Sequence, residues 1–314
     1  MKLFLATFEA LAALFVIGLI GFWIIRRRQV PAQVLRFLST LAIEIALPSL
    51  VFVRILQGLR PAEQPDWWLW PLRYLAFAAW AGVLTVLCSW WARKDTRREF
   101  AASLFFQNIT FFPLVVLTHV FGPESSYVVA LFLFGILFSP FFFNTYYFFF
   151  ARERRGIRWG KTLHPVVIAS GAAVLLCVLG AQDRVPGFLV SSLGLLGDMT
   201  IPLLMLVLGG NLYVDIQKGG TPRLLETAKF VAAKNIVFPL ATLALLVALR
   251  PSKEVALILF LQSAVPPVTS IPIFAEREGG NAVIASQFLV GSCAVSLVSV
   301  PLWMIVYGHC FPGP

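Results

Sequence analysis

The chain has 314 residues, of which 59% are hydrophobic and 13% are charged, and its formal net charge is +10. A soluble domain carries roughly twice that charged fraction. The composition therefore excludes an ordinary water-soluble fold and, with a mean hydropathy of +0.85, indicates a polytopic helical membrane protein. The basic residues follow the loops between apolar segments, as topology signals do, so we expect no nucleic-acid partner.

Taken in chain order, the apolar runs predict ten membrane-spanning helices. Runs of about 20 residues are long enough to cross a hydrocarbon core of ~30 Å. The first run is too long for a signal peptide and ends in Arg26-Arg27-Arg28 without a small-residue cleavage pattern, so we expect it to be retained. The predicted spans are 3–25, 34–57, 67–92, 98–120, 124–150, 163–180, 187–213, 223–249, 254–275 and 281–307.

Lysine and arginine are unevenly divided between alternate loops. Sixteen lie in the loops after the first, third, fifth, seventh and ninth spans, whereas the other loops hold only Arg60, Arg184, Arg250 and Lys253. The positive-inside rule makes the first set of loops cytoplasmic. We therefore expect a multi-pass protein of the inner (plasma) membrane with both termini on the outer side, in contact with membrane lipid.

Short matches between the two halves of the chain indicate an internal duplication. They recur at offsets of 154 or 155 residues: Val30-Pro31 with Val185-Pro186, Glu44-x-x-x-Pro48 with Asp198-x-x-x-Pro202, and Gln107 with Gln262. Five spans per half is an odd number, so the second half must be inverted relative to the first. We expect residues 1–155 to form the first five-helix repeat and residues 156–314 the second, an arrangement common among secondary transporters.

Two corresponding stretches place polar residues and proline inside long apolar segments. They are 107–115 (QNITFFPLV) and 262–270 (QSAVPPVTS). Proline lacks an N–H and its ring clashes with the carbonyl four residues earlier, so each helix should break or kink there. Freed backbone groups at membrane depth are tolerated where they are buried in protein or line a watery cavity, and paired breaks of this kind are typical of transporter binding sites.

We therefore predict that the breaks bind substrate. Amide, hydroxyl and backbone groups are available there, and helix N-termini that meet at a break favour an anion such as a carboxylate. The alternative is a pair of proline kinks satisfied by neighbouring helices. The candidate substrate-binding residues are Gln107, Asn108, Thr110, Pro113, Gln262, Ser263, Pro266, Pro267, Thr269 and Ser270.

Four charged residues within or near spans are further candidates. Glu44 and Asp198 each precede a proline by four residues, so a carboxylate lies beside a displaced carbonyl. They could carry a coupling proton or sodium ion, or they could join the two halves structurally. Lys234 lies deep in its span and could balance an acid or attract an anion, and Arg73 is close enough to a helix end to snorkel. The sequence contains no metal, cofactor or catalytic motif, so we expect neither a cofactor nor enzyme activity.

Several motifs in combination resemble the auxin efflux carrier family, specifically its bacterial members, over essentially the whole chain. They are Leu38-Ser39 through Pro48, Asn108-x-x-Phe111-x-Pro113-Leu114, Ala264-x-Pro266-x-x-Thr269, Gly279-Gly280-Asn281, Ser286-Gln287-Phe288 and Ser296-Leu297-x-Ser299-x-Pro301-Leu302.

The resemblance implies an all-α membrane fold of ten helices in two inverted five-helix repeats, similar to sodium/bile-acid symporters. Helices 1, 2, 6 and 7 would form a scaffold and a homodimer surface. Helices 3–5 and 8–10 would form a moving transport domain in which helices 4 and 9 cross at their breaks. Asn108, Pro113 and Pro266 would line the substrate site, with malate- or malonate-like acids as substrates in bacterial relatives.

The chain departs from the plant members of that family. It has Arg73 and no acid where they have an acid–base pair, and its loop between the halves is short. We therefore expect a secondary transporter of a small organic anion, malate-like or auxin-like, that works by alternating access. The alternatives are a sodium-coupled symporter of a larger organic anion, a channel, and a non-transporting scaffold or sensor.

Overall fold

The computed structural model describes residues 2–27, 31, 33–150, 163–217 and 221–311, and within them every regular element is a helix. The elements up to residue 150 are α1 (Lys2–Arg26), α2 (Gln33–Leu41), η1 (Ala42–Ala46), α3 (Leu47–Gly58), α4 (Leu69–Cys88), η2 (Ser89–Trp91), α5 (Arg97–Phe105), α6 (Phe111–Phe121), α7 (Ser126–Gly135), α8 (Phe138–Thr145) and η3 (Tyr146–Phe149). Those that follow are α10 (Pro165–Val178), η4 (Gln182–Arg184), α11 (Gly187–Asp198), α12 (Thr200–Gln217), α13 (Leu224–Ala232), η5 (Ala233–Val237), α14 (Phe238–Leu249), α15 (Lys253–Ala264), α16 (Ile271–Arg277) and α17 (Ala282–Cys310).

Among the described residues, seven helical stretches are long and apolar enough to cross a membrane. They correspond to seven of the ten predicted spans. The predicted span 163–180 contains the 14-residue helix α10. The predicted spans 98–120 and 254–275 are not continuous, because each is divided into two short helices. Both divisions fall in the stretches where the sequence predicts a break.

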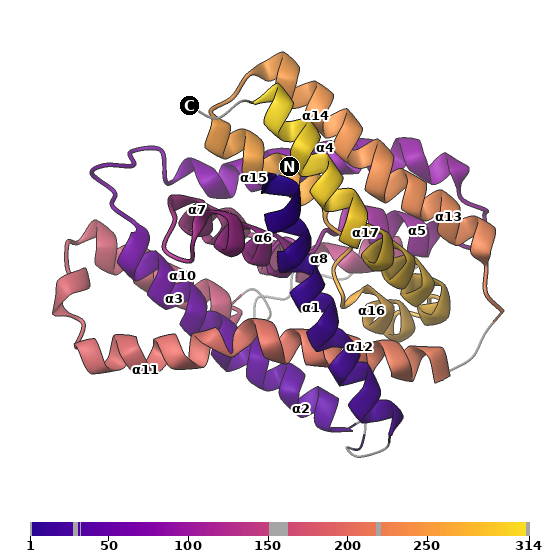
Figure 1. The fold of residues 1–314 in the computed structure, drawn as a ribbon, viewed down its shortest axis with the longest axis horizontal. Helices are drawn as coiled ribbons and strands as arrows, with labels where there is room; N and C mark the ends of the chain where they lie inside the picture. Colours follow the sequence, from indigo (N-terminus) through magenta and orange to yellow (C-terminus); the bar gives the residue numbers. More distant parts are fainter. Residues whose placement is uncertain (1, 28–30, 32, 151–162, 218–220, 312–314) are drawn as a thin grey trace.

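The helices form two groups (Figure 1). In the first group, α1 packs along α12, and α3 packs against α10 and α11. In the second group, α4 packs against α5 and α7, α14 against α15, and α17 against α13 and α16. We call these the first helix group (α1–α3 and α10–α12) and the second helix group (α4–α8 and α13–α17). Helix α1 connects them, since it also packs against α6 and α17.

The contact between α1 and α12 depends on glycine. A Cβ atom built on Gly209 of α12 would overlap the carbonyl of Gly18 on α1, and one built on Gly21 would overlap the backbone of Leu206. Glycine lets two membrane helices approach until their backbones touch, which increases van der Waals contact where no hydrophobic driving force acts between helices. These glycines therefore set the spacing of the first helix group.

Prolines distort three further helices, two of them where the sequence predicts a displaced carbonyl. The π-helical turn η1, which contains Glu44, immediately precedes the helix that holds Pro48. The turn η5 precedes Pro239 in the same way, and its Asn235 carbonyl accepts a hydrogen bond from Trp303 Nε1 at 2.7 Å. The chain is also interrupted between Asp198 at the end of α11 and the start of α12, four residues before Pro202. A π-turn is a frequent mark of functional positions in helices.

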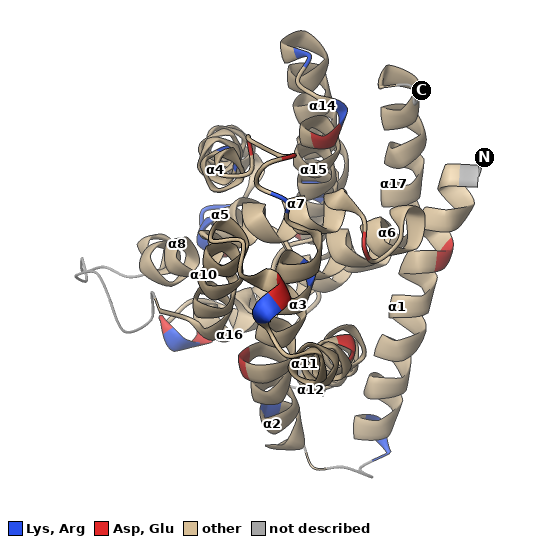
Figure 2. Ribbon diagram, turned by 90° about the vertical axis from the view of Figure 1, so that its left-hand side faces the viewer, with Lys and Arg blue, Asp and Glu red and all other residues tan. Residues whose placement is uncertain are grey.

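The exterior is suited to lipid. Large apolar side chains are exposed on the long helices, including Leu19 of α1, Val86 of α4 and Leu195 of α11. Helix α17 has 29 residues and carries no lysine, arginine, aspartate or glutamate, and its ribbon is tan in Figure 2, the colour of all other residues. The fold is therefore that of an all-α, multi-pass membrane protein.

Candidate functional site

The first break separates α5 from α6. The chain is non-helical from Phe106 to Thr110, and the side chain of Asn108 closes the N-terminal end of α6 by accepting a hydrogen bond from Phe111 N at 3.1 Å. Asn108 is only 1% exposed. Pro113, in the first turn of α6, has no N–H to offer the carbonyl of Ile109. This carbonyl therefore needs a partner from elsewhere.

The second break separates α15 from α16. Residues 265–270 are non-helical, and Pro266 and Pro267 occupy the positions whose N–H groups would bond the carbonyls of Gln262 and Ser263 in a continuous helix. Neither proline has an N–H. The C-terminal end of α15 therefore presents two carbonyls that backbone hydrogen bonding in a helix does not satisfy.

The two breaks pair with each other. Gln107 and Pro267 form an antiparallel bridge, in which Asn108 N donates to Pro266 O at 3.0 Å and Val268 N donates to Phe106 O at 2.9 Å. The bonds join segments about 160 residues apart in sequence. They satisfy backbone groups that would otherwise be exposed at membrane depth, where no water replaces them.

Side chains complete the crossing. Gln262 Nε2 donates to the Ile109 carbonyl at 2.9 Å, which is the carbonyl that Pro113 leaves without a helical donor. Ser263 Oγ donates to Phe260 O at 2.6 Å, and Gln107 Nε2 donates to Leu104 O at 2.6 Å. The alternative to a binding site was that groups on neighbouring helices satisfy the backbone freed at the proline kinks. These hydrogen bonds show that this is true of some of the polar groups at the crossing.

Three amide atoms at the crossing remain unpaired. Gln107 Oε1, Asn108 Nδ2 and Gln262 Oε1 are buried and have no hydrogen-bond partner in the described part of the chain. A buried amide group without a partner costs about 1–3 kcal/mol. The crossing thus holds one spare donor and two spare acceptors, which a ligand or an ordered water would satisfy.

Lys234 reaches the second break from the π-turn η5. Its side chain is fully buried, and Nζ donates to the freed Ser263 carbonyl at 2.8 Å. Nζ also lies 5.0 Å from the centroid of the Phe238 ring. The neighbouring Asn235 is turned the other way and bonds Ser292 of α17 through both of its amide atoms, at 3.2 and 2.8 Å.

A cavity of about 290 Å³ lies between the two helix groups. The N-terminal residue of α6, Phe111, lines it, and so do Thr269 and Ser270 at the end of the second break. Its other walls come from α1, α2, η1 and α12 on one side and from α16 and α17 of the second helix group on the other. The lining is mostly apolar with a few polar groups, which is typical of small-molecule sites.

The predicted site residues therefore separate into two sets. The structure brings all of them to the crossing, but only Thr269 and Ser270 line the larger cavity. Gln107 lines a void of about 10 Å³ among aromatic side chains, a volume close to that of one water. The remaining predicted residues, Asn108, Thr110, Pro113, Gln262, Ser263, Pro266 and Pro267, line neither cavity.

Sequence reasoning did not assign a site role to three polar residues of the cavity. They are Ser39 on α2, Asn211 on α12 and Ser286 on α17. Ser39 and Ser286 belong to the motifs that support the family resemblance, so they could have been selected. Asn211 follows the glycine pair 209–210 within an apolar helix, and an isolated polar residue in such a helix is the signal that would have identified it.

The other charged candidates lie away from the crossing. Glu44 is exposed on the first helix group, and Asp198 is exposed on the same group and lies 3.6 Å from Arg54 Nη2. Arg73 is at one end of α4, where its guanidinium stacks on the Trp70 ring at 4.5 Å and borders a pocket of about 240 Å³. Charged residues within membrane spans usually face the protein interior, but Glu44 and Asp198 are both exposed in the single chain.

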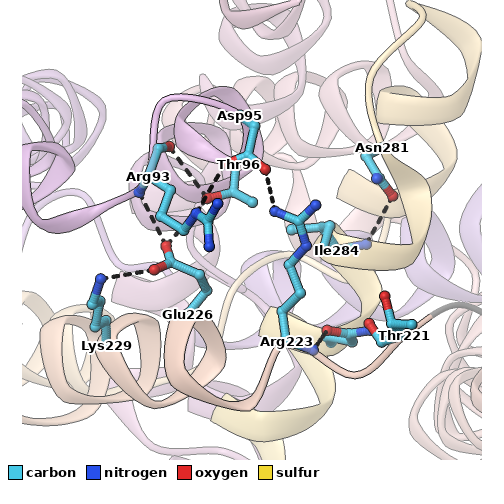
Figure 3. Close-up of polar contacts among 10 residues, drawn as sticks. Arg93, Asp95, Thr96, Thr221, Arg223, Glu226, Lys229, Asn281 and Ile284 are labelled. Atoms are coloured by element: carbon cyan, nitrogen blue, oxygen red, sulfur yellow. Dashed lines mark hydrogen bonds and ion pairs between the residues drawn. The ribbon is translucent and has the colours of Figure 1, made fainter.

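A polar network fastens the loop after α4 to the start of α13 (Figure 3). The buried Glu226 carboxylate accepts hydrogen bonds from Arg93 N at 3.1 Å, Thr96 Oγ1 at 3.2 Å and Lys229 Nζ at 2.7 Å. Arg223 binds Asp95 beside it, and this hydrogen bond holds the pKa of the exposed Asp95 carboxyl below its usual range. The Arg223–Asp95 contact is therefore present at neutral pH and is lost only when the pH falls through that lowered pKa.

We predict that Glu226→Gln lowers the apparent melting temperature of the purified protein by several degrees. The substitution removes the negative charge that pairs with Lys229. It also turns one of the two acceptor oxygens into an N–H₂ donor, so either Lys229 Nζ or the pair Arg93 N and Thr96 Oγ1 then faces a donor instead of an acceptor. Differential scanning fluorimetry measures the change. Glu124→Gln, at an exposed position, is the matched control and should leave the melting temperature unchanged. An equal effect of the two substitutions would contradict the network's role.

In this structure two broken helices cross beside a cavity, within a bundle of lipid-facing helices. This arrangement is typical of integral membrane proteins that move solutes. A family model described as "Membrane transport protein" matches residues 6–158 and again residues 154–304. The chain therefore belongs to this membrane transport protein family, the family of the auxin efflux carriers, and the resemblance found in the sequence is confirmed. This is a transporter family and not an enzyme family. No curated protein matches the chain.

Proposed function

We propose that the protein is a secondary transporter that moves a small organic anion across the membrane by alternating access. The observation that carries the proposal is the hydrogen-bonded crossing of two broken helices at the edge of a cavity of about 290 Å³. Asn108 Nδ2 supplies a buried donor without a partner. The N-terminal end of α6 adds a partial positive charge that favours an anion.

The proposed topology has ten membrane crossings in two inverted repeats. Seven continuous spans alone would leave the termini on opposite sides of the membrane. The start of α1 and the end of α17 instead lie at the same end of the molecule, where Gly308 of α17 is beside Leu3 of α1 (Figures 1 and 2). If α10 and the two broken helices also cross the membrane, the seven continuous spans become ten crossings, an even number that places both ends on the same side. The division of basic residues between the loops supports outer termini in the plasma membrane.

In this proposal the first helix group is the scaffold and the second is the transport domain. The cavity lies between the groups, and each contributes polar residues: Ser39 and Asn211 from the first, Thr269 and Ser270 from the second. Movement of one group against the other would open the site to each side in turn. The exposed acids Glu44 and Asp198 on the first group fit a surface that a second copy covers in a homodimer.

Two alternatives make different predictions. A sodium-coupled symporter of a larger organic anion would bind sodium in a saturable way, whereas a non-transporting scaffold or sensor would carry no flux. A channel would carry flux without saturation. The mostly apolar cavity of about 290 Å³ favours a ligand of a few heavy atoms over a large one, since it is at the low end of small-molecule pockets.

A thermal-shift screen of the purified protein tests the substrate class. We expect a mono- or dicarboxylate, malate-like or aromatic, to raise the melting temperature in a saturable way, because a ligand that binds only the folded state stabilises it. Amides of the same acids are the controls, since they keep the shape and lack the charge. Stabilisation by the neutral amides as strong as that by the acids would contradict an anion site.

A further inference from the structure

The C-terminal end of α15 has the features of a cation site. Pro266 and Pro267 leave the carbonyls of Gln262 and Ser263 without helical donors, and the unpaired Gln262 Oε1 is close in sequence to both. The C-terminal end of a helix carries a partial negative charge. In transporters with broken helices, unwound carbonyls and half-helix C-termini coordinate the coupling ion.

In this chain the position is already occupied by a side chain. The Lys234 ammonium donates to the Ser263 carbonyl at 2.8 Å and contacts the Phe238 ring face at 5.0 Å. The carbonyl oxygen and the ring face each bind a cation more strongly than they bind a neutral donor. Lys234 lies in the π-turn η5 and bonds the break, while its neighbour Asn235 bonds Ser292 of α17.

No acid balances this ammonium among the described residues. Within that part of the chain Lys234 has no carboxylate within 4.0 Å. Apart from Cys293 in the middle of α17, the elements packed against η5 carry other charged or titratable groups only near their ends. On α13, Glu226 and Lys229 pair with each other, and the remaining groups are Arg250 after α14, Lys253 and Glu254 on α15, and Cys293, Tyr307, His309 and Cys310 on α17.

We propose that Lys234 is a tethered cation that fills the position of a coupling sodium ion, so that the carrier works without sodium. The inference rests on the proposed transport function and specifies its ion dependence. A covalently attached ammonium supplies the positive charge that the freed carbonyls require, and it cannot leave with the substrate. Removal of that charge should recreate a vacant cation site at the end of α15.

Thermal stability in sodium tests the inference without a substrate. The purified protein is melted in NaCl up to about 150 mM, a physiological ionic strength, with choline chloride replacing sodium. We expect the wild-type melting temperature to be independent of sodium, and that of Lys234→Ala to rise by several degrees in a saturable way. Lys253→Ala removes an exposed charge at the far end of α15 and should give no sodium response.

Two results would overturn the inference. One is saturable stabilisation of the wild-type protein by sodium. The other is a folded Lys234 variant, monodisperse in size-exclusion chromatography, that shows no sodium response. Lys234→Gln keeps a donor for the Ser263 carbonyl, so it provides the same neutral test if the alanine variant does not fold. Because sodium alone is the probe, a failed search for organic anions would contradict the proposed function and leave this result unaffected.

Discussion

Asn108→Asp should reduce organic-anion binding and transport on the order of 10- to 100-fold while leaving the protein folded. The aspartate retains an oxygen that accepts the hydrogen bond from Phe111 N, so the end of α6 stays capped. It removes the buried, unpaired Nδ2 donor at the crossing and adds a negative charge that is one hydrogen bond away from Phe111, a residue that lines the cavity. A hydrogen bond to a charged group contributes about 1.5–3 kcal/mol, which sets the size of the expected loss.

Two alanine variants separate capping from binding. Asn108→Ala loses both the cap and the donor, so it should lower stability by roughly 0.5–2 kcal/mol as well as abolish binding. Asn281→Ala loses a similar cap, in which Asn281 Oδ1 accepts from Ile284 N at 3.1 Å, and should lower stability while transport continues. Unchanged anion affinity in Asn108→Asp would remove Asn108 from the site. Affinity from the thermal-shift titration and uptake into proteoliposomes are the readouts.

Gly209→Val should be the most destabilising single substitution in the first helix group. A Cβ atom at this position overlaps the backbone carbonyl of Gly18, and neither backbone can yield without separating α1 from α12. Overpacking of a side chain costs about 1–3 kcal/mol, and a clash with backbone should exceed this range. We expect little monodisperse protein after solubilisation, measured by fluorescence-detected size-exclusion chromatography.

A valine at Gly194 is the control for the Gly209 substitution. Gly194 lies in α11, in the same helix group, and a Cβ atom there meets no atom within 4 Å. The two substitutions cost the same intrinsic helix propensity, so their difference isolates the contact with α1. Equal yields of the two variants would show that α1 and α12 are not held together through this close approach.

The breaks could be predicted from the sequence because proline acts locally. The lack of an N–H at Pro113, Pro266 and Pro267 requires an interruption wherever these residues occur in an apolar segment. The same rule predicted distorted backbone at Glu44 and Asp198, where the structure has a π-turn and a helix end. It does not fix which way a side chain points, and both acids are exposed in the single chain.

The partners at the crossing could not be predicted, because they depend on how distant segments pack. The bond from Gln262 Nε2 to Ile109 O joins residues 153 positions apart. The sequence placed Lys234 deep in its span but could not show that its ammonium bonds the Ser263 carbonyl. The cavity is also a product of packing, since Asn211 and Thr269 meet there from different helix groups. The predicted polar residues were therefore found at the crossing, but most are used to join the breaks.

Counterflow in proteoliposomes tests the central claim most directly, namely that the crossing of two broken helices forms a binding site open to one side of the membrane at a time. Vesicles loaded with an excess of the unlabelled anion identified by thermal shift receive a trace of the labelled anion outside. We predict a transient accumulation of label above equilibrium, saturable with external anion and absent in Asn108→Asp. Label that equilibrates without overshoot, at the same rate in wild type and variant, would contradict the account.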